Sequence, residues 1–276
     1  MKSITSAANA NFRRWLRLAT QPRAVREEKQ TLAEGLHLAQ AALAPDVADA
    51  AVSAAVSAVI VRAGARGGAD RTIAPLLERA LQCGAAGFEL AAALYDRIAP
   101  VEQGSGLLLV LDIAPAVLPS SLAADVLFLD RIQDPGNAGA LLRTAAAAGV
   151  AMVVAAPGTA SLWAPKVLRA AQGAHFRLHL QEDIAAAQLR AVFSGTVIGM
   201  LAHGATPLWS APLPSGAVAW IAGAEGSGLS GDALAVCDGR VTIPVAAAVE
   251  SLNVAAATAI CLFERQRRRL QSVAVA

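Results

Sequence analysis

The chain has 276 residues, of which 55% are hydrophobic, 16% charged and 4% aromatic, and its formal net charge is +2. This composition excludes a largely disordered chain, because disordered segments combine few apolar residues with high net charge. The length suits two domains, each with its own core. Mean hydropathy is +0.49, but the uncharged stretch 191–224 is repeatedly interrupted by glycine and proline. It cannot form the roughly 20 continuous helical residues of a membrane span, and several short buried strands fit it better.

The cysteines and the start of the chain indicate a cytoplasmic protein. Cys83, Cys237 and Cys261 are far apart in the sequence, and we expect reduced thiols in the core. The basic residues near the start are not followed by the apolar run of a secretion signal. The four histidines have no metal-ligand spacing, so no metal site is expected.

Positive charge gathers at the two ends of the chain. Residues 1–30 hold seven basic and two acidic side chains, and residues 264–270 hold four arginines and one glutamate. Such clusters suit a polyanionic partner, RNA or DNA, more than a membrane. Solvated helix faces explain the same charges equally well.

The first half of the chain alternates helical and strand patterns. Asn9–Gln21 predicts a basic amphipathic helix, docked through Phe12, Trp15, Leu16 and Ala19. Further helices are predicted at Leu36–Leu43, Ile73–Leu81 and Leu90–Ile98, and strands at Ala58–Val61 and Leu107–Leu111. The proline-rich and serine-rich segment 112–122 predicts a domain boundary.

The second half predicts a parallel α/β sheet covered by helices on both faces. The predicted strands are Val126–Leu129, Met152–Ala155, Phe176–Leu180, Thr196–Leu201, Val218–Ala222 and Arg240–Ile243. The predicted helices are Ala138–Ala148, Leu162–Ala171, Ile184–Phe193 and a last helix from Ser251 to about Leu270, which would bury Leu252, Ala256, Ala259 and Phe263. Ligands of such sheets bind beyond the carboxyl ends of the strands.

The first segment at such a strand end is 130–139, which contains Asp134-Pro135-Gly136-Asn137. Asn137 is a natural helix N-cap, and a helix N-terminus favours an anionic group. Arg143, on the same helix, can reach back toward that anion and hold a phosphate. An ordinary capped turn with a surface arginine explains this segment at least as well.

Two later segments carry polar residues that turn and cap chemistry does not fully explain. Gly223–Leu229 holds three glycines and Glu225, and its spacing fits neither a dinucleotide-binding fingerprint nor a hydrolase elbow. A flexible turn explains the glycines but not Glu225. In the third segment, which runs from Ile243-Pro244 to Ser251-Leu252-Asn253, capping explains Ser251 but does not require Asn253.

Taken in order, the three segments resemble the motifs of the SpoU-type (TrmH-like) RNA 2′-O-ribose methyltransferases of the SPOUT superfamily. The resemblance covers roughly Val126–Arg265. It implies a SPOUT-type parallel sheet with a C-terminal trefoil knot over residues 122–276. It also implies a smaller, L30e-like α/β domain that binds the RNA substrate over residues 1–111, where Glu34-Gly35 carries the likeness. Ala171 is a departure, since many relatives carry serine there.

For the site, the resemblance implies S-adenosylmethionine as cofactor and a structured RNA as substrate, with rRNA favoured over tRNA. The cofactor would be held around Gly199, Gly223, Ile243 and Leu252, and the reacting ribose by Asn137, Arg143, Glu225, Ser251 and Asn253. The family also implies a homodimer.

Two questions stay open at this point. Arg143 is either the base that deprotonates the 2′-hydroxyl or a phosphate clamp, and a guanidinium is a poor base. The alternative function is a catalytically silent RNA-binding or ribosome-associated protein on the same fold, against which the intact Asn137, Arg143, Glu225 and Asn253 argue.

Overall fold

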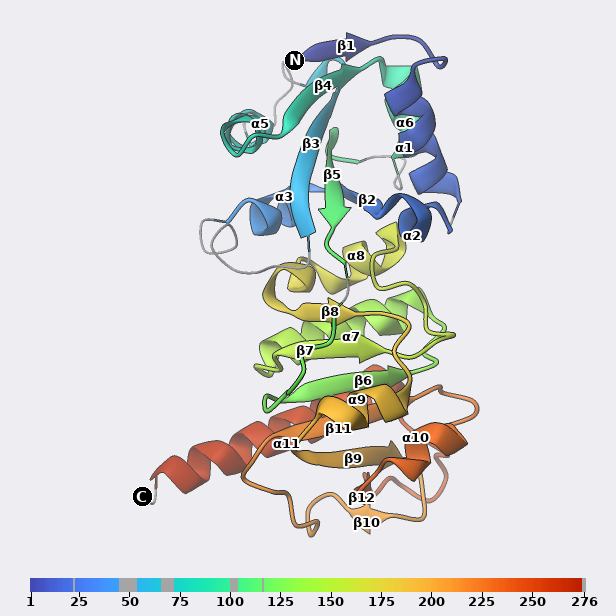
Figure 1. Cartoon of the computed structure of the whole chain (residues 1–276), viewed down its shortest axis with the longest axis vertical. Coiled ribbons are helices and arrows are strands. Elements are labelled where there is room, and N and C mark those ends of the chain that lie inside the picture. The colour runs from blue at the N-terminus through green and yellow to red at the C-terminus, as the bar shows by residue number, and fades with distance from the viewer. Residues whose placement is uncertain (22, 45–53, 66–71, 100–103, 116, 275–276) are drawn as a thin grey trace. The chain divides into compact units, whose positions relative to one another are not determined.

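The computed structural model describes the chain except for residues 22, 45–53, 66–71, 100–103, 116 and 275–276 (Figure 1). The chain forms two compact units. The first unit comprises Met1–Pro115 and Trp163–Arg177, and the second comprises Ala116–Leu162 and Leu178–Ala276. The segment Trp163–Arg177, placed by the sequence in the domain 122–276, therefore packs with the first unit.

A mixed five-stranded sheet forms the first unit. Its order is β1 (Lys2–Ile4), β4 (Ala86–Leu90), β3 (Ala54–Arg62), β5 (Leu107–Ile113) and β2 (Gln30–Glu34). β4 pairs in parallel with β1 and β3, whereas β5 is antiparallel to β3 and β2. The helices are α1 (Ala10–Thr20), α2 (Ala24–Glu28), α3 (Leu36–Ala42), α5 (Ile73–Gln82) and α6 (Ala92–Ile98). The predicted helices are confirmed within two residues, except that Leu90 ends β4 and does not begin α6.

Helix α1 is docked, as the sequence predicts. Asn9 caps it by accepting hydrogen bonds from the backbone of Asn11 and Phe12. Its buried side chains are Phe12, Trp15 and Leu18. Of the two other predicted positions, Leu16 is only partly buried and Ala19 is exposed. The basic side chains of α1 consequently lie on a helix that is fixed to the sheet.

The segment Trp163–Arg177 joins the first unit through β2. Helix α8 (Pro165–Ala171) packs on β2, and the buried Thr31 hydroxyl donates to the Trp163 carbonyl at 2.7 Å. The predicted helix start at Leu162 is wrong, because Ala164 is the N-cap. Phe176 lies in the 3₁₀ helix η2 (Ala174–Arg177) and not in a strand.

The second unit is built on a seven-stranded, wholly parallel sheet, which confirms the predicted α/β fold. Its order is β10 (Thr206–Pro207), β12 (Gly239–Thr242), β9 (Thr196–Leu201), β11 (Val218–Gly223), β6 (Val126–Asp130), β7 (Met152–Ala155) and β8 (His179–Gln181). All five residues of β6 are buried, as expected of a strand covered on both faces.

Helices cover the two faces of this sheet. On one face, Phe128 and Ile221 share a core with Leu189 of α9 (Ala186–Val192) and Ala233 of α10 (Gly231–Ala235). The alternate strand residues point to the other face, where α7 (Pro135–Ala147) packs against α11 (Val254–Ala274). Among the described residues, no helix is both long and apolar enough to span a membrane.

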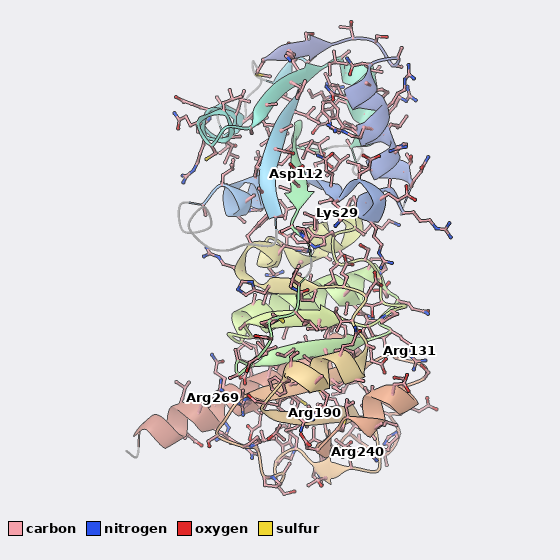
Figure 2. The ribbon with its side chains drawn as sticks, viewed as in Figure 1. Lys29, Asp112, Arg131, Arg190, Arg240 and Arg269 are labelled. Atoms are coloured by element: carbon pink, nitrogen blue, oxygen red, sulfur yellow. The ribbon has the colours of Figure 1, made fainter. Side chains whose placement is uncertain are left out.

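Polar contacts, and not an apolar stripe alone, fix α11 in place. The buried Arg265 guanidinium binds both carboxylate oxygens of Asp125 at 3.0 Å and donates to the carbonyls of Pro214 and Gly216. Arg269 adds a second ion pair to Asp125 at 2.8 Å. Figure 2 shows Arg269 and Arg131 at opposite sides of the second unit, at the amino and carboxyl edges of its sheet.

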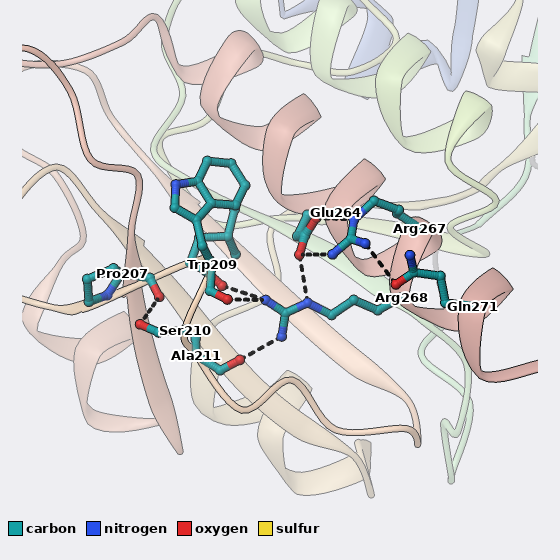
Figure 3. Close-up of polar contacts among 9 residues, drawn as sticks. Pro207, Trp209, Ser210, Ala211, Glu264, Arg267, Arg268 and Gln271 are labelled. Atoms are coloured by element: carbon teal, nitrogen blue, oxygen red, sulfur yellow. Dashed lines mark hydrogen bonds and ion pairs between the residues drawn. The ribbon is translucent and has the colours of Figure 1, made fainter. Parts of the chain in front are cut away.

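Arg267 and Arg268, on the same stretch of α11, also make polar contacts (Figure 3). Arg268 donates to the carbonyls of Leu208 and Ala211 and to Glu264. Hydrogen bonds from Arg267, and then from Arg268, lower the pKa of Glu264 to about 2. All four arginines of 264–270 therefore have intramolecular partners, and two of them, Arg267 and Arg269, keep exposed side chains. That this segment binds a polyanion stays a prediction.

The buried face of α11 differs from the predicted stripe. Val254, Thr258, Cys261, Leu262 and Arg265 are buried, whereas Ala256 is exposed and Phe263 is 44% exposed. The sequence interpretation favoured apolar residues, but two of the five buried positions are polar.

We expect Arg265→Ala to lower the free energy of unfolding by about 3 kcal/mol, because it leaves the Asp125 carboxylate, which is only 10% exposed, with fewer partners. Arg267→Ala is the matched control, since it removes an exposed arginine with an i,i+3 partner. This control should change stability by less than about 0.5 kcal/mol. Urea unfolding measures both, and equal effects would contradict the role assigned to Arg265.

Candidate active site

A pocket lies at the carboxyl ends of β9, β11 and β12 and is closed on one side by the start of α11. The space between its walls, including the open mouth, amounts to about 690 Å³. Its lining is mainly apolar side chains and backbone. Gly223, Ile243 and Leu252, three of the predicted cofactor residues, are part of it, as is Ser251.

Beside the pocket, three side chains from the three predicted segments form a hydrogen-bonded ring. The amide nitrogen of Asn137 donates to Glu225 Oε1 at 2.8 Å. The amide nitrogen of Asn253 donates to the same oxygen at 2.8 Å and to Asn137 Oδ1 at 2.9 Å. Asn137 and Asn253, which lie 88 and 28 positions from Glu225 in the sequence, therefore converge on one carboxylate oxygen.

The orientation of both amides follows from their other contacts. Asn253 Oδ1 accepts from the backbone of Ala255 and Ala256, so its nitrogen must face Glu225. Asn137 Oδ1 accepts from Asn253, so its nitrogen faces Glu225 as well. This arrangement leaves Glu225 Oε2 without a hydrogen bond in the part of the chain that the structure describes.

The helix caps differ from the prediction by a few residues. Asp134, not Asn137, caps α7 and accepts from the Asn137 backbone at 2.7 Å. Asn253, not Ser251, caps α11, which begins at Val254. The Asp134 carboxylate thus already occupies the helix N-terminus that was expected to hold a phosphate.

The glycine loop after β11 is tightly folded. The Gly228 amide donates to the Ala224 carbonyl at 2.8 Å, and Gly228 has φ +64°, a value that favours glycine. A Cβ at Gly223 would lie 2.5 Å from the Gly228 backbone. A side chain at position 223 is therefore excluded by the loop itself, in addition to the space that a ligand needs.

Asp130 also holds this loop, and the sequence interpretation assigned it no role. It is buried at the end of β6, directly opposite Gly223, and its carboxylate accepts from the Ser230 backbone at 2.5 Å. An acidic residue that ends a buried strand was the available signal, because such a group needs a partner.

Three predicted site residues lie apart from the ring. Arg143 is exposed on α7, and none of the described residues hydrogen bonds or ion pairs with its side chain. Ser251 is exposed and lines the pocket, but it has no described contact with Glu225. Gly199 is not part of the pocket lining. A Cβ there would meet Leu229 and Cys237 within 3 Å, so packing explains this glycine.

The cysteines are not placed as predicted in every case. Cys261 is buried at the pocket wall, and burial raises the pKa of its thiol to about 12. Cys83 is exposed and not in the core. Among the described residues, no group of three or more His, Cys, Asp or Glu side chains could hold a metal ion.

Comparison with known proteins gives a family match and a full-length relative. Residues 125–263 match the SpoU rRNA Methylase family. The 23S rRNA (guanosine(2553)-2′-O)-methyltransferase RlmP of Bacillus subtilis strain 168 is 32% identical over 273 residues, which cover 95% of this chain and 98% of that protein.

Solved structures agree at the level of the fold. A putative RNA methyltransferase of the TrmH family from Porphyromonas gingivalis is 28% identical, with a TM-score of 0.75 over 95% of this chain and 100% of that one. The AdoMet-bound rRNA methyltransferase from Sinorhizobium meliloti has a TM-score of 0.80 at 22% identity, over 97% and 98% of the two chains.

Proposed function

Because the chain belongs to the SpoU rRNA Methylase family and is an RNA methyltransferase, we propose that it transfers a methyl group from S-adenosylmethionine to a ribose 2′-hydroxyl of rRNA. The observation that carries the proposal is the convergence of Asn137, Glu225 and Asn253 beside the pocket. The rRNA substrate is favoured because the relative matched over 98% of its length is named as acting on 23S rRNA.

The pocket fits the cofactor by its chemistry. Its apolar walls suit the nucleoside, and Gly223 keeps the adjacent backbone free of a side chain. Gly223, Ile243 and Leu252 would contact the cofactor directly, whereas Gly199 would act through packing. The bound cofactor supplies an electrophilic methyl carbon attached to a positively charged sulfur.

The residues of the chain then have to orient the 2′-oxygen toward that carbon and accept its proton. Positioning of this kind contributes about 7–11 kcal/mol to lowering a barrier. Glu225 Oε1 is occupied by the two asparagines, so Oε2 is the oxygen that can accept the hydroxyl proton. Ser251, at the exposed rim of the pocket, would contact the ribose.

Arg143 fits the role of a phosphate clamp better than that of a base. A guanidinium has donors but no acceptor, and the Arg143 side chain has no intramolecular partner among the described residues. It is therefore free to bind the RNA backbone. A carboxylate nearer to the pocket, that of Glu225, is the better proton acceptor.

The remaining parts of the proposal concern assembly, RNA binding, chain topology and cellular location. Two exposed apolar side chains of α11, Phe263 and Leu270, support a homodimer in which a second copy covers part of this helix. We also infer that residues 1–111 form the L30e-like, RNA-binding domain, and the exposed Arg13 on α1 is available for a phosphate contact. A C-terminal trefoil knot over 122–276 and action in the cytoplasm complete the proposal.

The direct test is to incubate the protein with S-adenosylmethionine and unmodified rRNA and to map 2′-O-methylated nucleotides by mass spectrometry. We expect methylation at a defined nucleotide, and none with Glu225→Gln, which keeps the side-chain shape but removes the carboxylate. Wild-type protein that binds rRNA without methylating any ribose would favour the catalytically silent alternative.

Arg143→Ala separates the two roles of this arginine. If Arg143 is a phosphate clamp, Arg143→Ala should raise KM for RNA by about 10-fold, and Arg143→Lys should recover much of the loss. Arg190→Ala is the control. Like Arg143, Arg190 is an exposed arginine on a helix of the second unit, but it pairs with Asp238. Its removal should leave KM unchanged. A large fall in the single-turnover rate at saturating RNA, not rescued by lysine, would instead assign Arg143 to the chemical step.

A further inference from the structure

Thr258 on α11 is a buried polar residue whose hydroxyl has no partner. The residue has 0% exposure, and Oγ1 makes no hydrogen bond within the described chain. A threonine inside a helix usually donates to the carbonyl four residues earlier, which here is that of Val254. No such bond is present, so the hydroxyl carries the cost of burial without compensation.

The other buried threonines of the described residues satisfy their hydroxyls. Thr31 donates to the Trp163 carbonyl at 2.7 Å, and Thr159 donates to the Leu129 carbonyl at 3.0 Å. Thr258 is therefore the exception among three threonines in the same state of burial. An unsatisfied buried group of this kind requires an explanation.

The position of Thr258 suggests an explanation for its unsatisfied hydroxyl, because this residue belongs to the wall of the cofactor pocket. Its neighbours in that wall are Val254, Ala257 and Cys261, and a thiol whose pKa is about 12 is a neutral, weak donor. The other polar side chains of the lining, Glu225 and Ser251, are exposed at the rim. Thr258 thus offers the one hydroxyl of the lining described by the structure that is fully buried.

We propose that the Thr258 hydroxyl hydrogen bonds to the adenine ring of the bound cofactor. The assignment rests on the proposed function and extends it to a residue outside the three motifs. Of the cofactor's parts, the amino acid and the sulfonium are charged and would be costly to bury against Val254 and Cys261. The adenine is flat and neutral, and its edge carries nitrogens that can accept from, or donate to, a hydroxyl.

Thr258→Val tests the contact, because valine keeps the shape and removes the hydroxyl. We expect the Kd for S-adenosylhomocysteine, measured by calorimetry on the full chain, to rise about 10-fold, which corresponds to about 1.4 kcal/mol. The Kd for 5′-methylthioadenosine, which keeps the adenine but lacks the amino acid, should rise by the same factor. Thr258→Ser should bind both ligands nearly as well as the wild type.

The Tm of the ligand-free protein is a second readout, which does not depend on enzyme activity. Without ligand, Thr258→Val should have a Tm equal to or above that of the wild type, because it removes an unsatisfied hydroxyl. The matched control Thr159→Val loses a satisfied hydrogen bond outside the pocket, so its Tm should fall while its Kd stays unchanged.

The outcomes separate this proposal from the proposed function. An unchanged Kd for Thr258→Val, or a fall in its Tm as large as that of Thr159→Val, overturns the role of Thr258. A loss of S-adenosylhomocysteine binding without any loss of methylthioadenosine binding overturns the adenine contact. A wild-type protein that binds neither ligand overturns the proposed function itself.

Discussion

The arrangement of the site depends on Asn253, whose side-chain amide forms hydrogen bonds through both its oxygen and its nitrogen. Its oxygen caps α11, and its nitrogen binds Glu225 and Asn137. The cap determines where the last helix begins, and the helix start in turn forms one wall of the pocket. Because one planar group makes both sets of contacts, the carboxylate of Glu225 cannot be positioned independently of α11. The fold of the C-terminal segment and the geometry of the site therefore depend on the same contacts of Asn253.

The far end of α11 is fixed by a second set of polar contacts. Arg265 and Arg269 bind Asp125 before β6, and Arg268 binds the carbonyls that follow β10. Buried ion pairs of this kind contribute little net stability against an apolar alternative, but losing one partner is costly. They hold the helix in one register, which keeps Asn253 at the distance that Glu225 requires.

Sequence periodicity predicted the parallel sheet and the docked α1, and turn residues at strand ends marked three segments, because these are local signals. That the three segments form one site followed from their resemblance to the motifs of SpoU-type methyltransferases. It could not predict the buried face of α11. Thr258 and Arg265 are polar but buried, and their burial depends on a ligand pocket and on Asp125, 140 residues away from Arg265. The caps at Asp134 and Asn253 were missed for a related reason, since neighbouring polar residues compete for the same position. The packing of Trp163–Arg177 with β2 has no local signal at all.

The most direct test of the central constraint is the single-turnover rate of methyl transfer by Asn253→Ser. Serine is an equally good N-cap, but it lacks the amide nitrogen that binds Glu225. With the ring opened, the rate should fall by about 100-fold, while the free energy of unfolding and the Kd for S-adenosylhomocysteine stay at their wild-type values. A wild-type rate in this variant would contradict the account, because it would show that the contact between Asn253 and Glu225 does not position the reacting groups.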